Sequence, residues 1–155
     1  MTNASNKEQD AIELLKSQHD EVKAMFKQYD ELGDRAKASK KKLAQKICEQ
    51  LTMHTMIEEE IFYPAVRAAS KELKDMLDEA LVEHASAKDL VAQVEEMEPD
   101  EDLYDAKVTV LGEYIDHHVE EEEEEMFTKV RKLGLDLKAL GLEMAERRDE
   151  ILATA

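Results

Sequence analysis

The sequence has few of the residues that interrupt helices, and few of those that favour strands. Its 155 residues include four glycines, two prolines, three phenylalanines, four tyrosines and no tryptophan. Ala, Leu, Glu, Lys and Met, which favour helix, are abundant instead. The single cysteine, Cys48, cannot form an internal disulfide, so nothing indicates an oxidising compartment.

Long apolar runs and basic clusters are also missing. No stretch approaches the roughly 20 apolar residues of a membrane span, and the start "MTNASNKEQD" has no signal-peptide core. The net charge of −17 argues against nucleic acid and anionic membranes as partners, because both attract basic patches. The same charge concentrates cations, including metal ions, near the protein. We expect one cytoplasmic domain over residues 1–155.

Apolar residues recur at helical spacing over five segments, and no strand pattern competes. The first begins near residue 7, and the others follow possible capping residues, namely Ser39, Ser70, Asp100 or Asp102, and Asp136. Four long segments with short loops predict an all-α antiparallel up-down-up-down four-helix bundle over about residues 8–133. Pro64 can kink its second helix. A short fifth helix at about 136–152 would cap the bundle or form a contact in a homodimer, so monomer and homodimer both stay open.

Each of the four long apolar stripes is interrupted by one histidine, at His19, His54, His84 and His118. On two helices a glutamate, Glu58 or Glu122, follows four residues later and so lies one turn along the same face. The histidines within each half are 35 and 34 residues apart, so the order His, then His-x-x-x-Glu, occurs twice. Each lies roughly 20–25 Å from its loops. The four imidazoles should therefore converge halfway along the bundle, around a pseudo-two-fold axis.

These six side chains suggest metal ions in the core. Burying a carboxylate costs several kcal/mol unless it is paired, and no arginine lies on these stripes. Mixed imidazole and carboxylate donors suit Fe, Mn or Zn better than Ca or Cu(I). A single such histidine is more often an ordinary core residue than a ligand. Six donors at one level exceed one tetrahedral zinc site but suit two ions bridged by the glutamates.

The run "HHVEEEEEEMF" at residues 117–127 is explained by the repeat. Aligning "HTMIEEEIFYP" with "HVEEEEEEMFT" superposes His118 on His54 and Glu122 on Glu58. Glu122 then points inward, while its neighbours face solvent or hydrogen-bond to ligand histidines. His117 is expected in a solvent-facing or outer position.

These motifs resemble the hemerythrin-like (HHE cation-binding) family of non-haem di-iron four-helix bundles, over about residues 12–130. The signature here is His, His-x-x-x-Glu-Glu-Glu-x-x-Tyr-Pro, Glu-His, then His-x-x-x-Glu-Glu-Glu. The tail "LGLDLKALGLEMAERR" is similar to an extra C-terminal helix of bacterial members. The resemblance implies two iron ions, bridged by Glu58, Glu122 and an oxo or hydroxo group. The implied ligands are His19, His54, Glu58, His84, His118 and Glu122.

Two features differ from the oxygen-carrying hemerythrins. Lys88 stands where those proteins have a fifth histidine, and the last helix carries His-x-x-x-Glu in place of His-x-x-x-x-Asp. Reversible oxygen carriage is therefore disfavoured. The four-His, two-Glu set instead resembles bacterial members linked to iron–sulfur cluster repair, nitric oxide and peroxide stress.

Three further residues are candidates for supporting roles. Lys23 and Lys88 each follow a ligand histidine by four residues; such lysines extend to water or donate to an anion at the site entrance. Tyr114, one turn before His118, either packs in the core or bonds to the iron site.

We therefore expect a centre that binds or reacts with oxygen, peroxide or nitric oxide in stress defence, and whether it turns these over as an enzyme is open. The alternative is a sensor, a store, or an iron donor for cluster repair without turnover. A metal-free helical interaction domain is a third interpretation. Ferritin-like iron oxidation is disfavoured, because Glu-x-x-His pairs are absent around these histidines.

Overall fold

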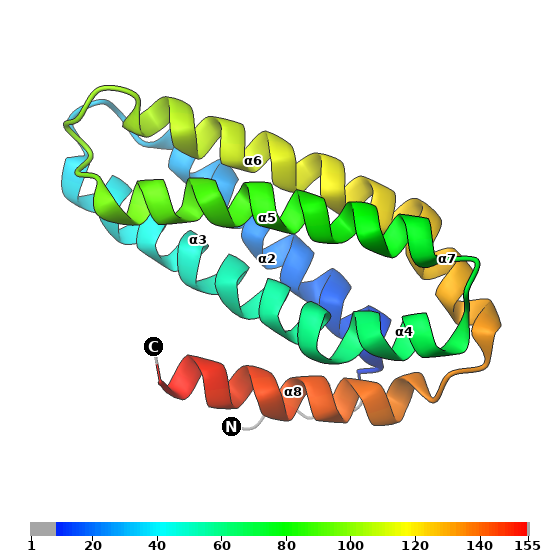
Figure 1. The fold of residues 1–155 in the computed structure, drawn as a ribbon. Helices are drawn as coiled ribbons and strands as arrows, with labels where there is room; N and C mark the ends of the chain where they lie inside the picture. Colours follow the sequence, from blue (N-terminus) through cyan, green and yellow to red (C-terminus); the bar gives the residue numbers. More distant parts are fainter. Residues whose placement is uncertain (1–8, 155) are drawn as a thin grey trace.

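The computed structural model describes residues 9–154, and it is built of helices (Figure 1). Four rods form the bundle. They are α2 (Ala11–Glu31); α3 (Lys37–Ile57), η1 (Glu58–Phe62) and α4 (Tyr63–Ala69); α5 (Lys74–Glu96); and α6 (Tyr104–Glu121), η2 (Glu122–Met126), α7 (Phe127–Val130) and η3 (Arg131–Leu133). The fifth helix is α8 (Leu137–Ala153). The predicted all-α bundle with a C-terminal helix is confirmed. Residues 1–8 and 155 of the expected domain, and the expected helix start at residue 7, lie outside the described part.

The rods form two antiparallel hairpins. α2 packs against α3, and α5 packs against α6, while contacts of α3 with α5 and of α2 with α6 join the hairpins. α8 packs on α2, α3 and η1, and Figure 1 shows it on the side of the bundle away from α6. One hairpin is therefore covered by α8, and the other is not. Within residues 9–154, no helix combines the length and the hydropathy of a membrane-crossing segment.

Three of these helices begin without a capping side chain. They start after Ala36, Leu73 and Leu103, none of which makes a side-chain cap, so the predicted caps Ser39, Ser70 and Asp100 or Asp102 are wrong. The fifth helix follows the prediction, because the Asp136 carboxylate accepts a hydrogen bond from the Ala139 N–H at 3.0 Å.

The apolar core has two parts with a polar layer between them. One part contains Ile12 and Leu15 of α2 and is extended by Met144 of α8. The other begins at Val22 of α2 and continues to the opposite loops. Between them His19 is buried on α2, and the other rods bury polar residues at the same level. The fold thus reserves one layer of its interior for polar side chains.

Two π turns flank this layer at equivalent places in the repeat. The Tyr63 N–H bonds to the Glu58 carbonyl, and the Phe127 N–H bonds to the Glu122 carbonyl, each five residues back. Each turn opens at the glutamate of a His-x-x-x-Glu motif. Such turns occur mostly as single insertions within α-helices, and they are frequent at functional sites.

Proline does not explain these turns. Pro64 follows the first one, at the start of α4, but Thr128 occupies the equivalent position after the second. Periodicity averaged along a helix cannot detect one inserted residue, so the sequence predicted a kink at Pro64 instead of a π turn in each half.

The docking of α8 against the start of α2 depends on Gly141. A Cβ added there would lie 2.5 Å from the Gln9 carbonyl oxygen, 2.8 Å from the Asp10 carbonyl carbon and 2.9 Å from the Ala11 nitrogen. We expect Gly141→Ala to lower the free energy of unfolding by about 1–3 kcal/mol, since backbone must move. Chemical denaturation of the purified protein measures this.

Gly33→Ala is the matched control, because nothing lies within 4 Å of a Cβ at that position. We expect its unfolding free energy to stay within about 1 kcal/mol of wild type. Equal effects of the two substitutions would contradict the close approach of α8 to α2.

Candidate metal centre

The six side chains predicted to hold metal meet in the polar layer between the two apolar clusters. They come from all four rods, and each is at most 6% exposed: His19 (α2), His54 (α3), Glu58 (η1), His84 (α5), His118 (α6) and Glu122 (η2). The sequence repeat is therefore also a spatial repeat, with one histidine pair from each hairpin.

Both glutamates lie between the two histidine pairs. The ring centroids of His19 and His54 are 4.9 Å apart, and those of His84 and His118 are 4.8 Å apart. Glu58 Oε1 lies 3.3 Å from His54 Nε2 and 3.1 Å from His84 Nε2. Glu58 therefore contacts one histidine of each pair.

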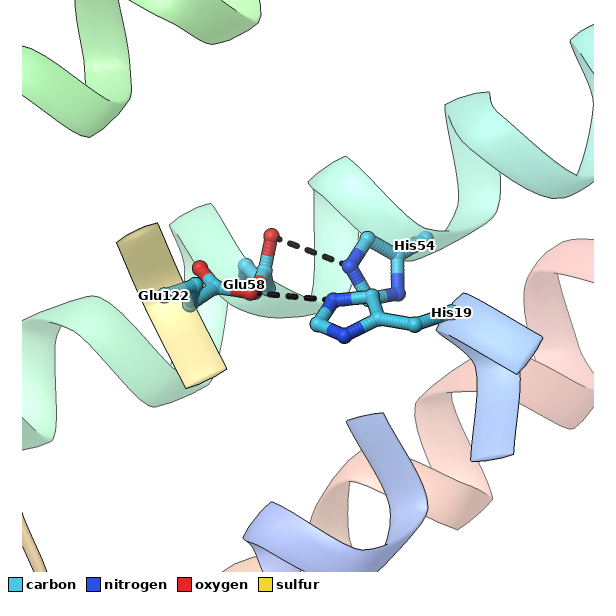
Figure 2. A group of neighbouring side chains, drawn as sticks. All are labelled: His19, His54, Glu58 and Glu122. Carbon is cyan, nitrogen blue, oxygen red and sulfur yellow. Dashed lines mark ion pairs between the residues drawn. The ribbon is translucent and has the colours of Figure 1, made fainter. Parts of the chain in front are cut away.

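Glu122 occupies the corresponding position from the opposite rod. Its Oε1 lies 3.0 Å from His19 Nε2, and its Oε2 lies 3.3 Å from His118 Nε2. Figure 2 shows one histidine pair, His19 and His54, with both carboxylates directed toward it. The arrangement places two carboxylates between two imidazole pairs.

Each imidazole is oriented by an acceptor on its outer side. The Nδ1 atoms contact Glu123 (His19, 2.7 Å), Gln18 (His54, 2.6 Å), Glu59 (His84, 2.7 Å) and Glu83 (His118, 2.7 Å). Ionised carboxylate and amide oxygens only accept hydrogen bonds, so in the neutral rings Nδ1 carries the proton. All four Nε2 lone pairs then point into the cluster. This pairing is typical of metal-binding histidines.

The interior of the cluster consequently brings hydrogen-bond acceptors, namely the Nε2 lone pairs and the carboxylate oxygens, close to one another. His84 Nε2 and His118 Nε2 are 3.2 Å apart. His19 Nε2 and Glu122 Oε1 approach to 3.0 Å, yet neither has a hydrogen-bond partner among residues 9–154. Both Glu58 oxygens also lack one. Burying such groups unpaired costs several kcal/mol each, so the cluster requires cations, either protons or metal ions.

Tyr63 supplies a hydroxyl to this cluster, and the sequence analysis did not identify it as a site residue. Its hydroxyl donates to Glu122 Oε2 and lies 3.4 Å from His84 Nε2 and 3.5 Å from His118 Nε2. Burial and the two carboxylates, Glu122 and Glu58, hold the pKa of Tyr63 well above its usual value, so the proton stays on the hydroxyl. The signal in the sequence was its spacing, five residues after Glu58, once a π turn is allowed.

The three candidate supporting residues lie outside the cluster. Tyr114 is 47% exposed and lies at the rim of the cavity beside the histidines. Lys88 Nζ bonds to Glu59 Oε1 at 2.8 Å, one carboxylate away from His84, and half of its side chain is exposed. Lys23 is exposed and lines an outer groove together with Glu123. Of these three, only Lys88 is connected by a hydrogen bond to an acceptor of a site histidine.

Comparison with known proteins identifies the family. The family described as Hemerythrin HHE cation binding domain matches residues 10–130, which span nearly the whole bundle. The chain belongs to the hemerythrin HHE cation-binding family. The resemblance inferred from the sequence is confirmed, and with it a cation-binding role, usually for iron.

Two individual proteins extend this comparison. The crystal structure of a hemerythrin HHE cation binding domain-containing protein from Mycobacterium kansasii superposes with a TM-score of 0.80 at 23% identity, covering 94% of this chain and 89% of that one. It shows a shared fold. A DNA nickase from Nostoc sp. (strain PCC 7120) is 25% identical over 134 residues, 84% of this chain. The chain spans 36% of the length of that relative.

The residues present fit the iron that the HHE family usually binds. Imidazole nitrogen with carboxylate oxygen is a donor set that iron accepts, and the unpaired buried atoms of His19, His54, Glu58 and Glu122 are the acceptors that a cation would satisfy. Two groups of donor atoms lie close enough together to share an ion: His19, His54, Glu58 and Glu122 in one, and Glu58, His84 and His118 in the other.

Protons compete with metal ions for this cluster. Burial lowers the pKa of His118, but Glu122, Glu83 and Glu58 outweigh burial and raise that pKa to about 11. The pKa values of His19 and His84 are raised too, because neighbouring carboxylates again outweigh burial. Burial would raise the pKa of Glu122, but His118 and His19 lower it well below its usual range. Without metal, His118 therefore holds a proton at neutral pH.

This competition predicts the pH dependence of metal binding. A protonated imidazole cannot ligate, so anaerobic addition of Fe²⁺ should release protons, and the apparent affinity should rise as pH increases from about 6 to about 8. Proton release is measured with an indicator dye in weak buffer. The variant Glu58→Gln with Glu122→Gln is the control and should release far fewer protons. Affinity that is independent of pH over this range would contradict the assignment.

Proposed function

We propose that this chain is a di-iron protein that binds or reacts with small oxidants such as oxygen, peroxide or nitric oxide. In this proposal His19 and His54 hold one ion, and His84 and His118 hold the other. Glu58 and Glu122, which lie between the two histidine pairs, would contribute to both ions. The two histidine pairs and their shared carboxylates support the assignment of six ligands.

One observation carries the choice of ligand class, namely the size and lining of the cavity beside the four histidines. A cavity of about 20 Å³ lies against all four histidines and is closed elsewhere mostly by apolar residues, Val22, Leu51, Ala87, Ile115 and Val119 among them. This volume accommodates about one water-sized molecule. A cavity of this size favours a ligand of a few atoms, such as a diatomic molecule or peroxide, over an organic substrate.

The chain's own residues give this cavity its chemistry. Bound iron would supply electron transfer and coordination positions for a small ligand. The four outer acceptors fix the imidazole rings, and the apolar lining excludes bulk water from the reacting volume. Tyr63 holds a proton on the hydroxyl that donates to Glu122 Oε2 and lies 3.4 Å from His84 Nε2, so it acts on a bound ligand through these two groups rather than from the cavity wall.

Peroxide decomposition tests whether the centre turns over. Added hydrogen peroxide should evolve oxygen at a rate that scales with the iron content of the preparation and exceeds that of the same amount of free iron. Oxygen is measured with an electrode. A protein that binds iron, and changes its spectrum with oxygen or nitric oxide but turns over none of the three oxidants, would instead fit a sensor, a store or a donor for iron–sulfur cluster repair. A protein that contains no iron after reconstitution would contradict both.

Tyr63 provides a sharper test of the chemistry. Tyr63→Phe removes only the hydroxyl, so we expect iron content to stay the same while the rate of peroxide consumption drops by about 100-fold. The optical spectrum of the iron centre should also shift, because Glu122 loses its hydrogen bond. Tyr114→Phe is the matched control and should keep both the rate and the spectrum. Equal effects of the two changes would exclude a specific role for Tyr63.

A further inference from the structure

A second cluster of metal-type donors lies on the surface of the α5–α6 hairpin, next to the buried centre. His117 Nε2 is 2.7 Å from Glu121 Oε1 and 3.7 Å from Glu83 Oε2. Ligand atoms of the three residues all lie within 4.8 Å of one another. The cluster combines one imidazole with two carboxylates, and His117 and Glu121 occupy successive turns of α6.

These three side chains are accessible from solvent. His117 is 66% exposed, Glu121 39% and Glu83 27%. Beside them a surface groove lined by Val82, Ser86 and Tyr114 opens to solvent. An ion could therefore reach the cluster without any movement of the bundle.

The other hairpin shows that the fold itself does not require these donors. Aligning His54 with His118 places Met53 opposite His117 and Ile57 opposite Glu121. Met53 and Ile57 are almost completely buried, in the cluster to which α8 contributes Met144. Where α8 covers the hairpin, the equivalent positions are apolar; where it leaves the hairpin open, they carry an imidazole and a carboxylate.

Glu83 connects the surface cluster to the buried centre. Its Oε2 faces His117, while its Oε1 accepts the hydrogen bond from His118 Nδ1 at 2.7 Å. The equivalent residue of the other hairpin is Gln18, whose neutral amide accepts from His54. The charge at Glu83 thus occurs only in the hairpin that also has His117 and Glu121.

We propose that Glu83, His117 and Glu121 form a further cation site, open to solvent, for a divalent ion such as Zn²⁺ or Fe²⁺. Imidazole with two carboxylates is a donor set that these ions accept, with water completing the coordination. The net charge of −17 raises the concentration of such ions at the surface. The ion would lie one carboxylate away from His118, outside the six ligands of the proposed di-iron centre.

The experiment uses iron-loaded protein and Zn²⁺. Wild-type protein dialysed against a zinc series should bind one zinc ion per chain while its iron content and optical spectrum stay constant, as elemental analysis reports. His117→Ala and Glu121→Gln should each weaken zinc binding by at least about tenfold, with iron content unchanged. Glu120→Gln removes the same charge from an exposed neighbour and should bind zinc like wild type.

Two results would overturn the proposal. One is zinc that binds only as iron is lost, and the other is equal zinc binding by wild type and His117→Ala. The second result would make the His117 cluster an ordinary surface ion pair, which contributes little to stability. Iron content, measured on the same samples, reports the buried centre independently, so failure of one site is distinguishable from failure of the other.

Discussion

One electrostatic constraint organises the interior of this bundle. Imidazole and carboxylate acceptors converge in a buried layer, away from bulk water. The four Nδ1 atoms are turned outward to Glu123, Gln18, Glu59 and Glu83, which leaves the Nε2 lone pairs facing the carboxylates of the core. Such a layer cannot be neutral and stable by itself. It requires positive charge inside the ring of donors, and the choice between protons and metal ions depends on pH and metal supply.

The two halves of the molecule are related but not identical. Tyr63 in one half corresponds to Phe127 in the other, and each ring stacks near a histidine, His84 or His19. Only Tyr63 brings a hydroxyl to the cluster. The outer partners differ as well, since a carboxylate serves His118 and an amide serves His54. An ion bound by His84 and His118 would therefore be surrounded by more negative charge and one more proton donor than its neighbour.

The sequence carried the ligand geometry because that geometry is periodic. His54 and Glu58 share a helix face by spacing alone, and their copies at His118 and Glu122 follow the same rule. Features that do not repeat along a helix could not be predicted from residue spacing. The π turns insert one residue, so Tyr63 turns inward although an uninterrupted α-helix would direct it elsewhere. Regular helical spacing from His118 indicated Tyr114 instead. The helices that start at Lys37 and Lys74 have no capping side chain, so a search for capping residues could not place their starts.

The division of the core has a consequence for cohesion. Each apolar cluster holds its own end of the bundle together, and the layer between them contains the buried polar side chains. Ions ligated by residues of all four rods would cross-link the helices at this polar layer. Such cross-links would couple the unfolding of the two ends of the bundle. Occupancy of the centre would then affect the cooperativity of unfolding as well as the chemistry of the site.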